Sequence, residues 1–231
     1  GLAKNRLLTS YFGISPELSV FYTADKAPSL IYALFVVGVL STVFIPIYAG
    51  ALKRDKAEAD KIASAMINFG SLVFIFLGIL VFCFSRQIFN LISAFQYSTA
   101  EIDLGVSMMR MILLAQILLL WGSFFTSMAQ THGYFLLSSM APVVYNLGMI
   151  LGIVFFNQKL GIQSATLGVL GGAMAYLLMQ IPIIKKIDLK YSFSWNINDS
   201  FMKKAFSSVP PRFLNVLVTS SIGVIHNSLA L

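Results

Sequence analysis

Long apolar runs without charged residues alternate with short charged stretches along most of the chain. Charged residues bound apolar runs at 27–50, 62–85 and 160–184, and a further uncharged stretch covers 111–158. A hydrocarbon core of about 30 Å needs about 20 helical residues to cross it, so each of the three runs predicts one membrane-spanning helix. The 111–158 stretch is long enough for two helices, divided at the polar turn 131–133. The pattern therefore predicts five complete spans.

The two ends of the sequence carry partial helical patterns. Residues 1–12 have the composition of a helix already under way, and residues 205–231 begin an apolar run that stops without a flanking charge. We therefore expect an internal fragment of a longer, transporter-sized chain. Residues 1–200 are expected to form a transmembrane lobe with a remnant of helix one, helices two to six and the loop after helix six. Residues 201–231 are expected to start helix seven.

Composition supports this architecture and excludes several classes of protein. Hydrophobic residues make up 58% of the chain and charged residues only 11%, too few to cover a soluble domain with solvated side chains. The mean hydropathy is +0.83. The net charge of +7 comes from Lys and Arg in short loops, so no basic face for nucleic acid is expected. The single cysteine, Cys83, excludes a disulfide framework and a cysteine-ligated metal site.

The basic residues also predict the orientation of the chain. Loops rich in Lys and Arg stay on the cytoplasmic side of a membrane. An even number of predicted crossings separates the loop between helices two and three from the loop between helices six and seven, so both are predicted to be cytoplasmic. Their basic residues are Lys53, Arg54, Lys56 and Lys61 in the first loop, and Lys185, Lys186, Lys190, Lys203 and Lys204 in the second.

Two segments outside the spans mix aromatic and polar residues. The first, 87–104, is expected to lie along the outer membrane interface. The second, 190–199, alternates aromatic residues with Ser and Asn, which favours an interfacial aromatic anchor over a short strand. No ligand is expected at the second segment.

Small residues and prolines recur inside the predicted helices. Glycines lie four residues apart in helix five and in helix six, a spacing that predicts close helix packing and, as an alternative, a sliding surface. Prolines inside spans favour kinked helices that form cavities. The glycines are Gly148, Gly152, Gly168 and Gly172, and the prolines are Pro28, Pro46, Pro142 and Pro182.

Catalytic arrangements are scarce. His132 lies in a turn and His226 on the last helix, with no carboxylate near either in sequence, so both are expected to be structural. The sequence has no glycine-rich phosphate loop and no paired Asp motif for a metal-bound diphosphate. We therefore expect a transporter rather than an enzyme, with no cofactor and no metal.

Four cations lie inside or at the edge of predicted helices: Lys4, Arg6, Arg110 and Arg212. No acidic residue lies within a fully apolar predicted span, so no internal ion pair is expected to neutralise them. Their side chains either snorkel to the membrane interface or line a cationic, water-filled cavity. In the second interpretation an anionic ligand supplies the counter-charge.

Short motifs in a fixed order resemble a known family. They are Gly1, Lys4, Phe12-Gly13, Phe21-Tyr22, Lys26-x-Pro28-Ser29, the run from Gly38 through Ser41 to Phe44-Ile45-Pro46, then Ala141, Pro142 and Asn146, and finally Gln180, Pro182, Lys185 and Lys186. Each motif is weak alone, but the ordered set resembles the MurJ/MviN lipid II flippases of the multidrug/oligosaccharidyl-lipid/polysaccharide exporter superfamily. The resemblance covers nearly the whole chain.

The resemblance implies an all-α, polytopic membrane helix bundle that forms the amino-terminal lobe of a two-lobed flippase. It implies that lipid II moves from the cytoplasmic to the outer leaflet of a bacterial inner membrane, by alternating access through a cationic cavity. Lys4 occupies the position of an essential arginine, and the expected cavity cations are Lys4, Arg6, Lys26 and Arg212. The expected structural or gating residues are Ser19, Ser29, Gly38, Pro46, Pro142, Asn146, Gln180 and Pro182. Lipid II and membrane lipids are the implied partners, and cell-wall synthesis proteins are candidate partners.

The chain departs from the family pattern at several charged positions. Ser19 replaces an acidic residue, Tyr32 and Ala33 replace paired arginines, and Val37-Gly38 replaces an acidic-glycine pair. These losses leave open whether the substrate is lipid II or another undecaprenyl-diphosphate-linked glycan, and whether the chain is a non-transporting paralogue that acts as an envelope scaffold. Arg6 is a candidate to compensate for one lost cation.

The sequence disfavours two further classes of membrane protein. A drug or sodium antiporter of the same superfamily needs a membrane-embedded carboxylate, which the predicted spans lack. A membrane glycosyltransferase needs a large extramembrane loop with acidic catalytic residues, which the sequence also lacks. Without a nucleotide-binding motif, the membrane potential or an ion gradient is the expected energy source.

Overall fold

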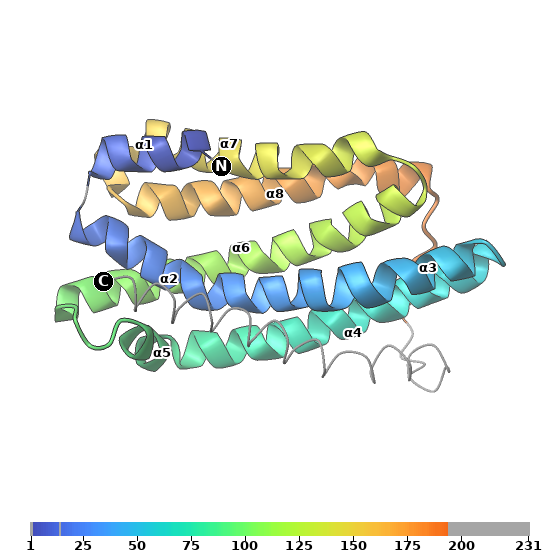
Figure 1. The fold of residues 1–231 in the computed structure, drawn as a ribbon, viewed down its shortest axis with the longest axis horizontal. Helices are drawn as coiled ribbons and strands as arrows, with labels where there is room; N and C mark the ends of the chain where they lie inside the picture. The colour runs from blue at the N-terminus through green and yellow to red at the C-terminus, as the bar shows by residue number, and fades with distance from the viewer. Residues whose placement is uncertain (1, 14, 194–231) are drawn as a thin grey trace, which may run out of the picture.

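The computed structural model describes residues 2–13 and 15–193, which form an all-helical bundle (Figure 1). The helices are α1 (Leu2–Phe12), α2 (Pro16–Ala33), the π-helix η1 (Leu34–Phe44), α3 (Ile45–Leu52), α4 (Lys56–Cys83), α5 (Ser85–Ile92), α6 (Thr99–Thr131), α7 (Phe135–Leu160) and α8 (Gln163–Lys186). No strand occurs within these described ranges. The predicted all-α class is confirmed.

Five helical segments of the described chain are long and apolar enough to cross a membrane, as the hydropathy pattern predicted. They are Pro16–Leu52, Lys56–Cys83, Thr99–Thr131, Pro142–Leu160 and Gln163–Lys186. The predicted division of the long uncharged stretch is also confirmed, because α6 ends at Thr131 and α7 begins at Phe135.

The first span begins earlier than the apolar pattern predicted. Its helix starts at Pro16, and the Ser15 hydroxyl accepts a hydrogen bond from the backbone N–H of Leu18 at 3.3 Å. Ser at the N-cap followed by Pro in the first turn is a strong helix start, and it precedes the charged residues that bound the apolar run. As a result Asp25 and Lys26 belong to the same continuous helix as the apolar span.

The segments α2, η1 and α3 form one long helical rod (Figure 1). The middle third is a π-helix, in which the Ile45 N–H bonds the carbonyl of Leu40, five residues back. Pro28 lies inside α2, while Pro46 lies in the first turn of α3 and is exposed there. The π-helix lies between the two prolines, and proline kinks stay a prediction.

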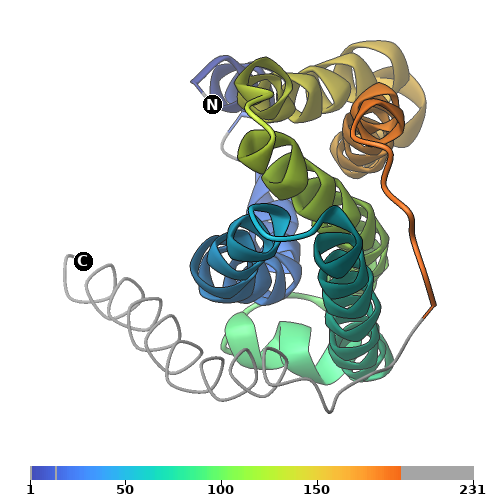
Figure 2. The same ribbon diagram turned by 90° about the vertical axis from the view of Figure 1, so that its right-hand side faces the viewer.

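Helix α6 runs through the middle of the bundle and contacts α2, α4, α7 and α8 (Figure 2). It begins with a capping box: the Glu101 N–H donates to the Ser98 hydroxyl at 3.4 Å, and the Ser98 N–H donates to the Glu101 carboxylate at 2.8 Å. Sixteen of its 33 residues are buried, because it packs against helices on both sides.

Helices α7 and α8 pack through the four predicted glycines. A Cβ atom at Gly148 would overlap the Cα of Gly172, and one at Gly152 would overlap the Cα of Gly168. Only a residue without a side chain lets the two backbones come this close. The prediction of close helix packing at these positions is confirmed.

Aromatic side chains fill the core beneath the rod. Phe44 is fully buried and meets Phe124 edge to face, with ring centroids 5.3 Å apart. Outside this core, large apolar side chains on α4 and α7 face away from the bundle, including Phe76 at 60% exposed and Phe155 at 70% exposed. Such exposed apolar faces are stable when lipid is the solvent.

The two predicted basic loops come together at one end of the bundle. The Lys56 ammonium contacts the Asp60 carboxylate at 2.8 Å and the backbone carbonyl of Asp188 at 2.6 Å. The Lys190 N–H donates to the same Asp60 carboxylate at 3.3 Å, and the Ser192 N–H donates to the Ser64 hydroxyl at 3.0 Å. These contacts tie the segment after α8 to the first turns of α4.

The two segments of mixed composition take different forms. Residues 85–92 form the short helix α5, whose Phe89 is fully buried while Leu91 is 75% exposed. Tyr191 is half-exposed and donates a hydrogen bond to Asn68 of α4. The described part of the second segment, 190–193, has no strand, and 194–199 lie outside the described residues.

Candidate functional site

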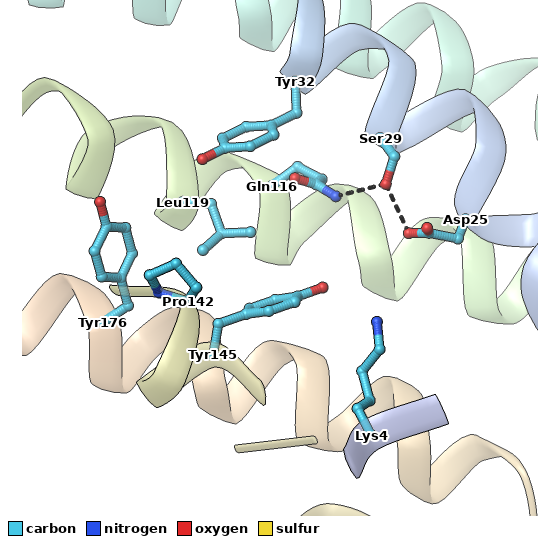
Figure 3. Close-up of a pocket in the computed structure, with 9 residues that line it drawn as sticks. All are labelled: Lys4, Asp25, Ser29, Tyr32, Gln116, Leu119, Pro142, Tyr145 and Tyr176. Atoms are coloured by element: carbon cyan, nitrogen blue, oxygen red, sulfur yellow. Dashed lines mark hydrogen bonds between the residues drawn. The ribbon is translucent and has the colours of Figure 1, made fainter. Parts of the chain in front are cut away.

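A cavity of about 350 Å³ lies between α1, α2, α6, α7 and α8 (Figure 3). Its lining residues carry one ammonium group, one carboxylate, three phenols, an amide and a hydroxyl. They are Lys4, Asp25, Ser29, Tyr32, Gln116, Leu119, Pro142, Tyr145 and Tyr176. The cavity therefore offers both a cation and several hydrogen-bonding groups to a polar ligand.

Lys4 enters this cavity from α1, which packs against α7. Figure 3 shows its ammonium group directed toward the side of the cavity that holds Asp25 and Tyr145. Lys4 interacts electrostatically with Asp25, but no salt bridge to Lys4 occurs in the described part of the chain. The ammonium group is therefore held near a carboxylate without being neutralised by direct contact.

A short chain of hydrogen bonds connects Asp25 to α6. The Ser29 hydroxyl donates to the Asp25 carboxylate at 2.9 Å, one helical turn away, and the Gln116 amide nitrogen donates to the Ser29 oxygen at 3.3 Å. Gln116 is 2% exposed, and its amide oxygen is buried without a partner. An unpaired buried acceptor is costly, so a ligand that brings an N–H or O–H donor to this wall gains a favourable contact.

Two tyrosines on the opposite side of the cavity are fixed to α6. The Tyr32 hydroxyl lies 2.8 Å from the Ser123 hydroxyl, and the Tyr176 hydroxyl lies 2.6 Å from that of Thr126. The sequence resemblance predicts an arginine at the position of Tyr32. Here the position supplies a neutral phenol held by α6, and Lys4 is the one cation among the lining residues.

The helices that contain the predicted spans extend beyond the fully apolar runs, and this places carboxylates in the same continuous helices. Asp25 is half-buried in the continuous segment Pro16–Leu52, and Asp60 is 4% exposed in α4. Charged residues bound the apolar runs, whereas the helices themselves begin further toward the amino terminus. Ser15 caps α2, and Asp55 caps α4 by accepting the N–H groups of Ala57 and Glu58 at 3.2 Å.

The structure brings only part of the predicted cation set to the cavity. Lys4 lines it, whereas Arg6 and Lys26 are exposed and are absent from its lining. Arg212 lies outside the described residues. Substrate binding by Arg6, Lys26 and Arg212 stays a prediction.

The predicted structural and gating residues divide in the same way. Ser29 and Pro142 line the cavity, and the Asn146 amide donates to the Pro142 carbonyl at 2.6 Å. Gln180 is fully buried in α8, and neither its amide nitrogen nor its amide oxygen has a partner. The remaining four lie away from the cavity: Ser19, Pro46 and Pro182 are exposed, and Gly38 is buried in η1. Their gating roles stay predictions.

Sequence reasoning did not single out Asp25, Gln116, Tyr145 or Tyr176 as site residues. A signal for Gln116 was present, because a glutamine inside an otherwise apolar helix needs a polar surrounding. The two tyrosines carry no such signal, since a tyrosine in a membrane helix is ordinary near an interface. Only the packing of α7 and α8 against α6 shows that they face one cavity.

Comparison with known proteins decides the family. The model of the family described as "Lipid II flippase MurJ" matches residues 8–230 of the chain. The chain belongs to this family. The predicted MurJ/MviN resemblance is thus confirmed over nearly the whole sequence.

Individual MurJ relatives agree with this assignment. The lipid II flippase MurJ of Thermosipho africanus is 32% identical over 199 residues, covering 85% of this chain and 40% of the relative. The probable lipid II flippase MurJ of Borreliella burgdorferi is 23% identical over 230 residues, covering 100% of this chain and 44% of the relative. The chain therefore spans less than half the length of these curated relatives.

A solved structure of the MurJ family has the same fold. It is titled "Lipid II flippase MurJ, inward closed conformation", is 30% identical, and superposes with a TM-score of 0.74 over 94% of this chain and 45% of that chain. Together with the five membrane-compatible helices, this match identifies a multi-pass membrane protein with a MurJ-like helix bundle.

Proposed function

We propose that this chain is the amino-terminal lobe of a lipid II flippase and that Lys4 receives the diphosphate of the lipid-linked substrate. Residues 1–200 make up the lobe, and residues 201–231 begin the helix that leads to a second lobe. The observation that carries the proposal is the position of Lys4: in a chain of the MurJ family, its ammonium group points into a cavity between helices and has no salt-bridge partner among the described residues.

The chemistry of the cavity suits a diphosphate with an attached sugar. An ammonium group in a low-dielectric cavity attracts a diphosphate strongly, through a charge-assisted hydrogen bond. The unpaired Gln116 oxygen can accept a hydrogen bond from a sugar hydroxyl or amide, and the Tyr145 and Tyr176 rings offer amphipathic surfaces. The polyprenyl tail stays in the surrounding lipid.

The orientation follows from the basic end of the bundle. Lys53 and Arg54 join α3 to α4, Lys56 and Lys61 lie in the first two turns of α4, and Lys185 and Lys186 end α8. By the positive-inside rule this end faces the cytoplasm of a bacterial inner membrane. Alternating access of the cavity then moves the substrate to the outer leaflet, driven by the membrane potential or an ion gradient.

Complementation tests the proposal in a bacterium whose own lipid II flippase can be switched off. The full-length protein is expected to restore growth, and Lys4→Ala is expected to fail at equal membrane abundance. Lys4→Arg keeps the charge and is expected to rescue. Lys159→Ala removes an exposed charge from the last turn of α7 and is expected to rescue as well. Growth supported by Lys4→Ala would contradict the proposed role of Lys4.

A second candidate is a flippase for another undecaprenyl-diphosphate-linked glycan. Two features favour it: Tyr32 supplies a phenol where the family pattern has an arginine, and Asp25 offsets the charge of Lys4. A cavity with less positive charge suits a head group that relies more on sugar contacts. If the full-length protein is inserted correctly but does not restore growth, binding assays with other polyprenyl-diphosphate glycans separate this candidate from a non-transporting scaffold.

A further inference from the structure

A second hollow lies at the end of the bundle opposite the basic loops. It is a groove of about 490 Å³ between the end of α4, the start of α5 and the first half of α6. Its lining residues are Phe82, Arg86, Asp103, Val106, Ser107, Arg110, Met111 and Leu114. None of them lines the Lys4 cavity, so the groove is a separate feature.

Arg110 is held rigidly in this groove. Its Nε donates to the hydroxyl of buried Ser85 at 3.0 Å, and its guanidinium carbon lies 4.7 Å from the centre of the Phe82 ring. These contacts fix the plane of the guanidinium group while leaving its two terminal nitrogens as further donors. In the described part of the chain Arg110 forms no salt bridge.

Arg86 supplies a second guanidinium on the same groove. Its Nη1 lies 2.6 Å from the Asp103 carboxylate, and both side chains are more than half exposed, at 52% and 59%. An exposed pair of this kind is weak and exchanges partners easily. With two arginines and one carboxylate, the groove keeps one excess positive charge, which favours an anionic ligand.

The length of α6 places Arg110 at a membrane boundary if Thr131 lies at the opposite one. From Arg110 to Thr131, the end of α6, is about 32 Å at 1.5 Å per residue, close to the hydrocarbon thickness of about 30 Å. The segment before Arg110 therefore extends past the hydrocarbon into the head-group layer. Phe82 and Leu114, at 44% and 52% exposed, line the apolar part of the same groove.

We propose that this groove binds an anionic membrane phospholipid. The terminal nitrogens of Arg110 donate to the phosphate, Arg86 contributes a second donor when it leaves Asp103, and an acyl chain lies along Phe82 and Leu114. A guanidinium fork matches the geometry of phosphate oxygens, and the apolar wall below it matches a lipid tail. This site is independent of the proposed substrate cavity.

Native mass spectrometry of the purified full-length protein tests this site, with phosphatidylglycerol and phosphatidylcholine as probes. We expect phosphatidylglycerol to be retained preferentially and Arg110→Gln to lower its retention about tenfold, the effect of losing a charge-assisted hydrogen-bond donor. Arg110→Lys keeps the charge but not the fork and is expected to fall between the two. Lys159→Gln is the matched control, because it removes an exposed charge at the same end of the bundle and is expected to have no effect.

Three results would overturn the proposal. They are unchanged retention in Arg110→Gln, equal retention of phosphatidylglycerol and phosphatidylcholine, and displacement of the lipid by soluble glycerol phosphate at equal concentration. If Arg110→Gln does not fold, Arg86→Gln replaces it, because Arg86 is half-exposed and its contact with Asp103 is on the surface. That variant is expected to lower retention about threefold, and no change would also overturn the proposal.

Discussion

Helix α7 packs tightly against α8 on one face and borders the Lys4 cavity on another. We call the α7–α8 contact at the four glycines the closed seam, and the cavity side of α7 the open interface. Toward α8 it presents Gly148 and Gly152, which leave no room for even one added carbon. Toward α2 it presents Pro142 and Tyr145, which border the cavity that holds Lys4. Glycines allow the close contact with α8, whereas the bulkier Pro142 and Tyr145 line the cavity. The cavity therefore borders a pair of helices whose backbones are in direct contact.

The largest expected effect comes from breaking the closed seam. Gly148→Ala places a Cβ against the backbone of α8, and such overpacking costs about 1–3 kcal/mol or more because backbone cannot move aside locally. Gly171→Ala is the matched control on α8, where an added Cβ meets nothing within 4 Å. Thermal unfolding in detergent is expected to show a clear loss of stability for the first variant and none for the second. Equal unfolding temperatures would contradict the closed seam.

The effect of the cavity carboxylate on ligand binding at the open interface is tested by the substitution of Asp25. Asp25→Asn keeps the shape of the side chain and removes the charge that opposes Lys4, so an anionic head group is expected to bind about threefold to tenfold more tightly. Release then becomes slower, and turnover falls although affinity rises. Glu17→Gln, an exposed change in the first turn of the same helix, is the control. Weaker binding by Asp25→Asn would show that the carboxylate contacts the ligand instead of competing with it.

A third interface, between α4 and the segment after α8 at the basic end, is polar but tightly packed. Asp60→Asn removes the ion pair with Lys56 and weakens the acceptor for the Lys190 N–H, so the segment after α8 is expected to detach more often from α4. A local loss of about 1–2 kcal/mol corresponds to roughly fivefold to thirtyfold faster hydrogen exchange at Lys190 and Ser192.

The nearby exposed pair provides the control for this exchange measurement. Glu58→Gln breaks a surface contact with Arg54 at 3.1 Å, and such a pair contributes less than about 0.5 kcal/mol. Its exchange pattern is expected to match the unsubstituted protein. If Asp60→Asn and Glu58→Gln behave alike, the buried carboxylate does not fix the segment.

The smallest expected effect concerns pH at the same end. His132 lies in the turn after α6, and its ring Nε2 is 3.0 Å from the Tyr48 hydroxyl. Burial and the nearby Lys56 lower the pKa of His132 below its usual value of 6.5. Because the unfolded chain takes up this proton more readily, the stabilisation is present above pH 6.5 and is lost as the pH falls through the folded pKa. The unfolding temperature is expected to drop below pH 6.5, and the drop is expected to be smaller in His132→Gln.

The sequence predicted the closed seam better than the open interface. Glycines four residues apart are sufficient to predict close packing, since the spacing itself defines a helix face. The cavity depends on tertiary arrangement: Lys4 and Arg6 are two residues apart, so their side chains leave α1 about 200° apart, and the sequence does not show which of them faces α7. Asp25 was missed for a related reason, because the helix boundary was placed at the charges and not at the cap residue Ser15.

The most direct test of the account is the affinity of the purified full-length protein for a polyprenyl-diphosphate glycolipid, measured with Lys4→Gln and with Lys159→Gln as the matched control. A charge-assisted hydrogen bond to the diphosphate predicts binding about tenfold to a hundredfold weaker in Lys4→Gln. Lys159→Gln is expected to bind like the unsubstituted protein. Equal affinity of all three proteins, each correctly folded, would contradict the claim that Lys4 receives the diphosphate in the cavity.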